Sequence, residues 1–256
     1  MSSSAFFLPD GDAFIATPNT RGPWSEHHQH GGPGAALLAA AFERAVAPLA
    51  VARITIEILR PIPIGRVELE LGELKPGSRT RLYGASMRVD GQEVCRASCL
   101  AIRTTELAIP RATAPAMRPP EDAAPVVFPF FMQPVGYHTA MELRIAEGGI
   151  GQGQANAWLR MRMPLVLGRP TSPLSRVAIA ADSGNGVSAR LDWTQWMFVN
   201  PDLTIHLHRL PRGEWVGLQA ITETEPHGIG LAVSVLHDED GPLGRSLQSL
   251  YLDARR

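Results

Sequence analysis

The sequence predicts an α+β protein built from two tandem units, each a central helix wrapped by an antiparallel sheet. Three observations carry this prediction: a strand motif that occurs twice, an Asp-Gly hairpin after each copy, and a Gly-rich segment before each copy. Hydrophobic residues make up 45% of the chain and charged residues 19%, an ordinary balance for a protein with a buried core.

The repeated strand gives the clearest sign of duplication. Residues 53–60 read Arg-Ile-Thr-Ile-Glu-Ile-Leu-Arg, and residues 202–209, which lie 149 positions later, read Asp-Leu-Thr-Ile-His-Leu-His-Arg. Asp90-Gly91 then separates two alternating runs in the first half, and Asp240-Gly241 does so in the second. Asp-Gly is a strong hairpin signal because both residues tolerate positive φ. Matching features in the same order predict an internal duplication.

A Gly-rich segment leads into a helix in each half. Residues 30–34, His-Gly-Gly-Pro-Gly, precede a helix predicted over 35–46, which ends before Pro48. This helix is apolar almost all round, so we expect it to be buried against the sheet. In the second half, residues 182–186, Asp-Ser-Gly-Asn-Gly, occupy the equivalent place before a shorter helix predicted near 187–191.

Proline-rich sequence separates the two halves. Residues 106–134 carry prolines at positions 110, 115, 119, 120, 125, 129 and 134. Proline at this density cannot continue a helix or a central strand, so we expect an extended linker on the surface. The predicted organisation is an N-terminal unit over 1–105, the linker over 106–134 and a C-terminal unit over 135–256.

Composition narrows the class of partner. The formal net charge is −1 with no long run of one sign, which disfavours nucleic acid and anionic membrane surfaces. No segment approaches the 18 apolar residues of a membrane span, and residues 1–24 lack the pattern of a signal peptide. Cys95 and Cys99 lie four positions apart in a predicted strand, with Cα atoms roughly 13 Å apart. They cannot form a disulfide together, and we expect buried thiols in a reducing cytoplasm.

A long buried helix wrapped by an antiparallel sheet is the hot-dog arrangement, and two tandem copies would form a double hot-dog. In this setting the sequence resembles the short bacterial branch of the type II acyl-CoA thioesterase family. The order of several segments carries the resemblance, which spans nearly the whole chain outside the linker. These segments are His-Gly-Gly-Pro-Gly at 30–34, Ala-Ala-Asp at 180–182, the strand at 200–209, Gly-Glu-Trp at 213–215 and Gly-Arg-Ser-Leu-Gln at 244–248.

The resemblance implies hydrolysis of acyl-CoA thioesters to free acid and CoA by an activated water, without a covalent acyl-enzyme or a cofactor. In that family an Asp, a Thr or Ser, and a Gln from the second repeat hold the water. The matching positions here are Asp182, Asn200 and Gln248. Asn200 departs from the family pattern because it has no hydroxyl, and Thr204 stays open as the functional equivalent.

Each candidate also has a structural interpretation. Asp182 could simply be the N-cap of the second helix, a role worth about 1 kcal/mol, although a helix N-terminus also favours the ionised carboxylate that a general base needs. Asn200 precedes Pro201, a common turn opening. Gln248 shares a strand face with Leu250, which predicts an inward amide that needs partners. The corresponding stretch 97–99, Ala-Ser-Cys, has no amide, so we expect no working site in the first unit.

Other kinds of site are disfavoured. The His-rich run at 27–30 and the pair His206 and His208 lack further ligands at a known metal spacing. The glycines at 31–34 lack the spacing of a dinucleotide loop, and the Gly-x-Ser-x-Gly motif of an α/β-hydrolase is missing from the sequence. We therefore expect neither metal nor cofactor.

Two alternative functions stay open. A hot-dog hydratase would need a His five positions after its Asp, where this chain has Val187. A non-catalytic acyl-binding protein is the stronger alternative, since Asn200 stands where a hydroxyl is expected. Homo-oligomerisation is possible, although a double hot-dog already contains the pairing that single units obtain by dimerising.

Overall fold

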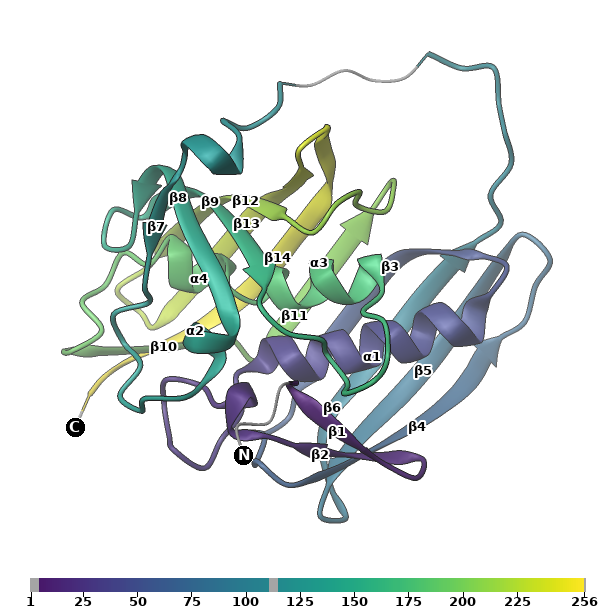
Figure 1. Cartoon of the computed structure of the whole chain (residues 1–256), viewed down its shortest axis with the longest axis horizontal. Coiled ribbons are helices and arrows are strands. Elements are labelled where there is room, and N and C mark those ends of the chain that lie inside the picture. The colour runs from purple at the N-terminus through teal and green to yellow at the C-terminus, as the bar shows by residue number, and fades with distance from the viewer. Residues whose placement is uncertain (1–4, 111–114, 256) are drawn as a thin grey trace.

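A computed structural model describes residues 5–110 and 115–255 of the chain (Figure 1). The first half contains β1 (Phe7–Asp10), β2 (Ala13–Ala16), the 3-10 helix η1 (Pro18–Thr20), α1 (Gly31–Val46), β3 (Ala50–Ile58), β4 (Arg66–Lys75), β5 (Thr80–Val89) and β6 (Gln92–Ile102). The second half contains α2 (Tyr137–Ala140), β8 (Met141–Gly149), β9 (Gln154–Met161), α3 (Pro173–Ala181), α4 (Gly184–Val187), β10 (Trp196–Val199), β11 (Asp202–Leu207), β12 (Val216–Thr224), β13 (Ile229–Asp238) and β14 (Gly241–Ala254).

The described strands form one sheet of 14 strands. Their order is β1-β2-β4-β5-β6-β3-β11-β14-β13-β12-β9-β8-β7, where β7 is Ala124–Val126, and β10 pairs with β14. Reading outward from the junction of β3 and β11, strands β6, β5 and β4 on one side correspond to β14, β13 and β12 on the other. Helices α1 and α3 pack against each other on one face of the sheet (Figure 1). This arrangement confirms the predicted double hot-dog.

The two halves join along the repeated strand. In the antiparallel pair of β3 and β11, Thr55 lies opposite Thr204, and Ile54 lies opposite Ile205. Thr204 is 149 positions after Thr55, so each of these threonines pairs with its own repeat counterpart. A pseudo-two-fold axis therefore passes through this pair, and the internal duplication appears directly in the register of the sheet.

Helix α1 is buried, as its composition predicts, and begins at Gly31 with His30 as its N-cap. Its first turn touches the end of α3: a Cβ added to Gly32 would lie 2.7 Å from the carbonyl oxygen of Ile179. Because that distance is shorter than any real contact, only glycine allows the N-terminus of α1 to approach α3 so closely.

The second helix lies earlier in the sequence than predicted. Its main part, α3, begins at Pro173, and the Ser172 hydroxyl caps it by accepting a hydrogen bond from the Ser175 N–H. Asp182 is the C-cap of α3, so the prediction that it starts a helix is wrong. The short helix α4 then replaces the helix predicted near 187–191. Serine followed by proline is a helix-start signal, and here it outweighs the resemblance between the two Gly-rich segments.

The described part of residues 106–134 contains only short regular elements, η2 (Pro120–Asp122) and β7 (Ala124–Val126). The segment leaves β6 as a long exposed loop (Figure 1). Its later part does not stay on the surface, because the Phe128 and Phe130 side chains are buried in the core. The expectation of a purely superficial linker is therefore wrong for this part.

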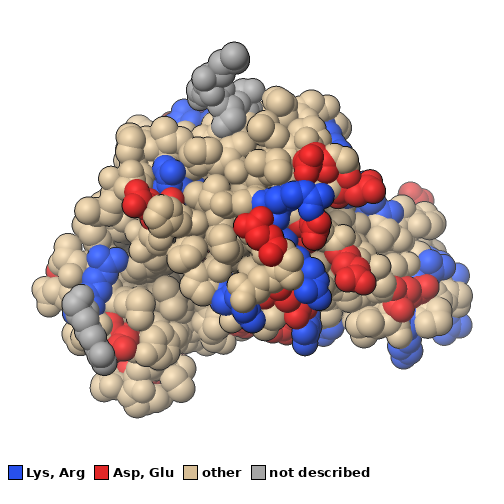
Figure 2. Space-filling view, turned by 90° about the horizontal axis from the view of Figure 1, so that it is seen from below, with Lys and Arg blue, Asp and Glu red and all other residues tan. Residues whose placement is uncertain are grey.

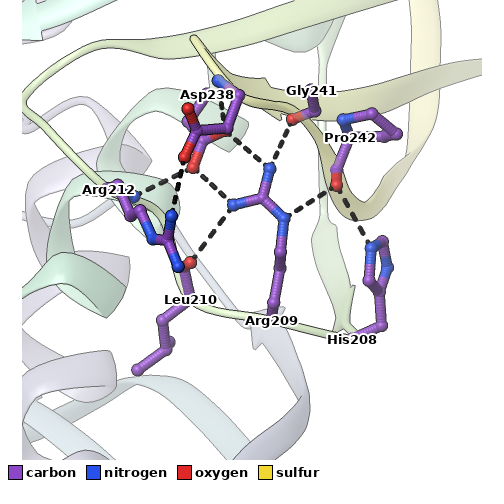
Figure 3. Close-up of polar contacts among 8 residues, drawn as sticks. His208, Arg209, Leu210, Arg212, Asp238, Gly241 and Pro242 are labelled. Atoms are coloured by element: carbon purple, nitrogen blue, oxygen red, sulfur yellow. Dashed lines mark hydrogen bonds and ion pairs between the residues drawn. The ribbon is translucent and has the colours of Figure 1, made fainter. Parts of the chain in front are cut away.

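A polar network surrounds the Arg209 side chain in the second unit (Figure 3). The Arg209 guanidinium donates to both carboxylate oxygens of buried Asp238 and to the Gly241 and Pro242 carbonyls. Its repeat counterpart Arg60 is exposed. Val89, 149 positions before Asp238, is a buried apolar residue at the same place before its hairpin turn. The two recurring arginines therefore have different surroundings.

The cysteines, the surface charge and the helix lengths can be compared with the expectations from composition. Cys95 and Cys99 are both free and buried, and burial raises the pKa of each thiol to about 12. Acidic and basic side chains are interspersed on the face shown in Figure 2, where the described residues form no large area of one charge. None of the helices within 5–110 and 115–255 is long and apolar enough to cross a membrane.

Candidate active site

Three predicted site residues from different elements meet in the second unit. Asp182 follows α3, Asn200 lies between β10 and β11, and Gln248 lies within β14. The Asn200 side-chain amide donates to Asp182 Oδ1 at 2.9 Å. The Gln248 amide donates to the Asp182 carbonyl oxygen at 3.1 Å and lies 3.4 Å from Oδ1. The predicted convergence is therefore present, at the end of α3 rather than at a helix start.

The Asp182 carboxylate also lies at the N-terminus of α1, in the other half of the chain. His30 Nδ1 is 2.9 Å from Asp182 Oδ2. A Cβ added to Gly31 would lie 2.9 Å from the same oxygen, so a larger residue at position 31 would displace the carboxylate. The positive end of a helix dipole favours a negative charge at this point. The electrostatic setting expected from the second helix is supplied by the first.

The pKa of Asp182 reflects opposing influences. Burial, the largest of them, raises the pKa, because the residue is only 6% exposed. The neighbouring His30, together with hydrogen bonds from His30, Asn200 and the Gly32 N–H, outweighs burial and holds the pKa below its ordinary value of 3.8. Asp182 is therefore a buried, ionised carboxylate.

A hydrogen must lie between His30 and Asp182. Two acceptor atoms 2.9 Å apart without a hydrogen between them would repel each other. Since the pKa of Asp182 is held low, this hydrogen belongs to His30 Nδ1. The Gly32 N–H lies within hydrogen-bond distance of both this ring nitrogen, at 3.1 Å, and the carboxylate. With the hydrogen on Nδ1, it donates to the carboxylate.

The His30 ring is fixed by its neighbours. It stacks on the Tyr137 ring with 3.9 Å between centroids and 4° between planes. The fully buried Tyr137 hydroxyl donates to the Ile179 carbonyl at 2.9 Å, and it is 2.7 Å from the Ser183 hydroxyl. Sequence reasoning placed His30 at the start of α1 but missed this contact with Asp182. The motif His-Gly-Gly-Pro at a helix start, which favours an anion, was the available signal.

Gln248 lies behind the carboxylate. Its side chain is 1% exposed, and its Oε1 accepts a hydrogen bond from the Asn185 N–H at 3.0 Å. It therefore faces inward, as the strand alternation predicts, and ties the start of α4 to Asp182. Thr204 lies elsewhere, since its hydroxyl is 3.4 Å from that of Thr55 at the junction of the two halves. The geometry favours Asn200 over Thr204 for the Thr/Ser position.

A cavity of about 390 Å³ opens onto this group. Asp182, Asn200, His30 and Gly31 line it, but Gln248 does not. Most of the remaining wall is apolar and includes Trp24, Ile58, Ile62, Phe130, Met197 and Phe198. A larger hollow of about 710 Å³ lies between the sheet and residues 115–118, and it contains none of the three predicted site residues. The smaller cavity therefore has the stronger claim to be the active site.

The sequence analysis expects no metal site at the histidines at positions 27, 28, 30, 206 and 208. Across the described ranges, no three His, Cys, Asp or Glu side chains are placed to hold a metal ion together.

Two family models match the sequence. The acyl-CoA thioesterase N-terminal domain matches residues 20–103, and the acyl-CoA thioesterase C-terminal domain matches residues 110–252. A search of curated proteins found no significant match.

Solved structures share the whole architecture. A thioesterase candidate from Novosphingobium aromaticivorans aligns with a TM-score of 0.77 at 21% identity, covering 97% of this chain and 98% of the other. A hot-dog protein of unknown function from Alicyclobacillus acidocaldarius gives 0.74 at 18% identity, with 98% and 96% covered. An acyl-CoA thioesterase II from Mycobacterium marinum gives 0.68 at 16% identity, with 96% and 94% covered. At these identities the likeness shows the fold alone.

Fold and site together define a double hot-dog protein with a buried acidic site where its two halves meet. The family models, which between them reach from residue 20 to residue 252, show more than the fold. The chain belongs to the acyl-CoA thioesterase family and is a thioester hydrolase.

Proposed function

We propose that the chain hydrolyses acyl-CoA thioesters to free acid and CoA with a water activated at Asp182. One observation carries the proposal: a buried, ionised carboxylate lies at the wall of a mostly apolar cavity, among polar groups that can hold a water. A buried carboxylate with a shifted pKa beside a cavity is typical of a functional site.

The neighbouring groups have separate roles in this proposal. Asn200 keeps its side-chain amide on Asp182, which leaves its Oδ1 to accept a hydrogen bond from the attacking water. Gln248 holds Asp182 in place from behind. The Gly31 N–H, at the N-terminus of α1 and at the cavity wall, is suited to stabilise the oxyanion of the tetrahedral intermediate.

The cavity wall supports an acyl substrate. Trp24 and Phe198 meet edge to face with their ring centroids 5.4 Å apart, and Phe130 adds a third aromatic ring to the lining. Burying an alkyl or aryl chain against such a surface contributes roughly 0.8 kcal/mol per methylene. We place the reaction in the cytoplasm, where both free cysteines would stay reduced.

The test is release of free thiol from a series of acyl-CoAs by the purified full-length chain. Turnover that saturates with substrate and rises with the acyl group's fit to the cavity supports the proposal. Tight binding of acyl-CoA without any thiol release would instead establish the alternative, a non-catalytic acyl-CoA-binding protein.

A further inference from the structure

The Asp182 carboxylate has few free positions for a proton. His30 Nδ1 occupies Oδ2, Asn200 and Gln248 approach Oδ1, and the Gly32 N–H adds a fourth donor. A carboxylate that is already so fully hydrogen-bonded accepts a further proton poorly. Asp182 is therefore better suited to orient a neighbouring base and stabilise the protonated form of that base than to take the proton of water itself.

His30 has the geometry of such a base. Its Nδ1 is committed to Asp182, and its ring lines the same cavity as Asn200 and Gly31. Its other ring nitrogen, Nε2, has no hydrogen-bond partner within the described part of the chain. With the hydrogen on Nδ1, Nε2 carries a lone pair. The stack on Tyr137 prevents the ring from turning away.

We propose that His30, through Nε2, is the catalytic base that takes the proton of the attacking water, with Asp182 as its positioning partner. The inference rests on the proposed hydrolysis and makes His30, rather than Asp182 itself, the group that takes the proton. An Asp that fixes the tautomer of a His and stabilises its protonated form is an arrangement that serves proton transfer in other hydrolases.

The steps balance as follows. The water oxygen attacks the thioester carbon while its proton passes to Nε2, giving a tetrahedral oxyanion and an imidazolium paired with Asp182. The oxyanion collapses, the C–S bond breaks, and the sulfur of CoA takes the proton from Nε2. The products are a carboxylic acid and the CoA thiol, and His30 returns to its neutral form.

A matched substitution separates the two roles of His30. In His30→Asn the side chain can still donate to Asp182, with its Nδ2 at the place of Nδ1. It has no atom at the place of Nε2. We expect kcat to fall by about 100-fold or more, with the melting temperature nearly unchanged. A rate within about threefold of the wild type would overturn the proposal.

Chemical rescue gives a readout that a purely structural role would not move. In His30→Ala, added imidazole should restore thiol release in proportion to its neutral form. The same addition to Asp182→Asn should restore nothing, because that variant keeps its own imidazole. His30→Ala that is inactive yet folded, and that imidazole does not rescue, would count against His30 as the base.

The pH profile supplies an independent check. The titratable and charged groups around His30 are Asp182 after α3, Tyr137 on α2, and His28 and Arg60 in the cavity wall. The wild-type rate should rise with pH as the base loses its proton, and His30→Asn should lose this rise. If His28 is the source of the rise, His28→Asn will remove it and His30→Asn will not, which contradicts the proposal.

Failure of this inference and failure of the proposed function give different results. A wild-type chain that hydrolyses no acyl-CoA removes the proposed function. A wild-type chain that is active, with Asp182→Asn inactive and His30→Asn fully active, keeps the function and makes Asp182 the direct base.

Discussion

His30 Nδ1 lies 2.9 Å from Asp182 Oδ2, although the two residues are 152 positions apart and belong to different halves of the chain. The contact depends on glycines at positions 31 and 32, which let α1 approach the end of α3.

Replacing Asp182 by Asn should lower kcat for thioester hydrolysis by about 100-fold or more while the protein stays folded. Asn has the same shape as Asp but no charge. It would favour the His30 tautomer that carries its hydrogen on Nε2 rather than on Nδ1. Alanine is a poorer test, because it would leave buried amide donors without a partner at about 1–3 kcal/mol each. Thiol release and circular dichroism together measure the effect. Exposed Asp12, at the turn between β1 and β2, gives the control Asp12→Asn. Wild-type turnover by the Asp182→Asn protein would contradict the proposed mechanism.

Asn200→Thr should keep most of the activity, within about fivefold, whereas Asn200→Ala should lose about 10- to 100-fold. A threonine hydroxyl can donate to Asp182 Oδ1 and accept from water, as Asn200 does, but alanine can do neither. Steady-state kinetics on one acyl-CoA compare the two variants. An Ala variant as active as the Thr variant would show that the polar group at position 200 is not needed.

Gln248→Ala should lower kcat and leave KM little changed, because Gln248 does not line the cavity but supports Asp182. The loss also leaves the buried Asn185 N–H without its acceptor, so we expect a loss of roughly 1–3 kcal/mol of stability. Urea denaturation and the split between kcat and KM measure these effects. Gln219→Ala, at an exposed position of β12, is the matched control. A change confined to KM would mean that Gln248 contacts substrate.

Ionisation of Asp182 should make stability depend on pH in a defined direction. Its pKa in the folded protein is lowered, so the unfolded chain takes up the proton first as the pH falls. The stability that Asp182 contributes is therefore complete above about pH 5. It should decline below about pH 4, by up to about 1.4 kcal/mol per pH unit, until the folded pKa is passed.

The comparison of wild type with Asp182→Asn isolates this effect from other carboxylates. The difference in unfolding free energy should shift in favour of the variant as the pH falls below about 4. A difference that stays constant down to pH 3 would mean that the carboxylate has an ordinary pKa in the folded protein.

Much of the fold could be predicted because duplication leaves a trace in the sequence. The matching residues at 53–60 and 202–209 are the strands that meet at the junction of the halves, and there the repeat and the register coincide. The second hairpin was misplaced by one position: its turn is Glu239-Asp240, since Asp238 pairs with Gly241. A two-residue turn signal fixes the neighbourhood of a hairpin better than its register.

The site was only partly predictable because its electrostatics are not local. Asp182, Asn200 and Gln248 come from one half, and resemblance to a family was enough to choose them. Their relation to the N-terminus of α1 depends on how α1 packs on α3, which a one-dimensional pattern does not contain. The same limit explains why the His30 contact with Asp182 was missed and why Asp182 was assigned to the wrong end of a helix.

The pseudo-two-fold axis through Thr55 and Thr204 has a consequence for stoichiometry. A symmetric dimer of single units would have two equivalent active sites. In a fused chain, the residues of one site can change without changing those of the other. At the positions 149 residues before Asn200 and Gln248, this chain has Val51 and Cys99, both buried and without an amide. If the proposed site is correct, we expect one active site per chain, to which the first half contributes the N-terminus of α1, and a single equivalent of acyl-CoA bound per chain in a titration.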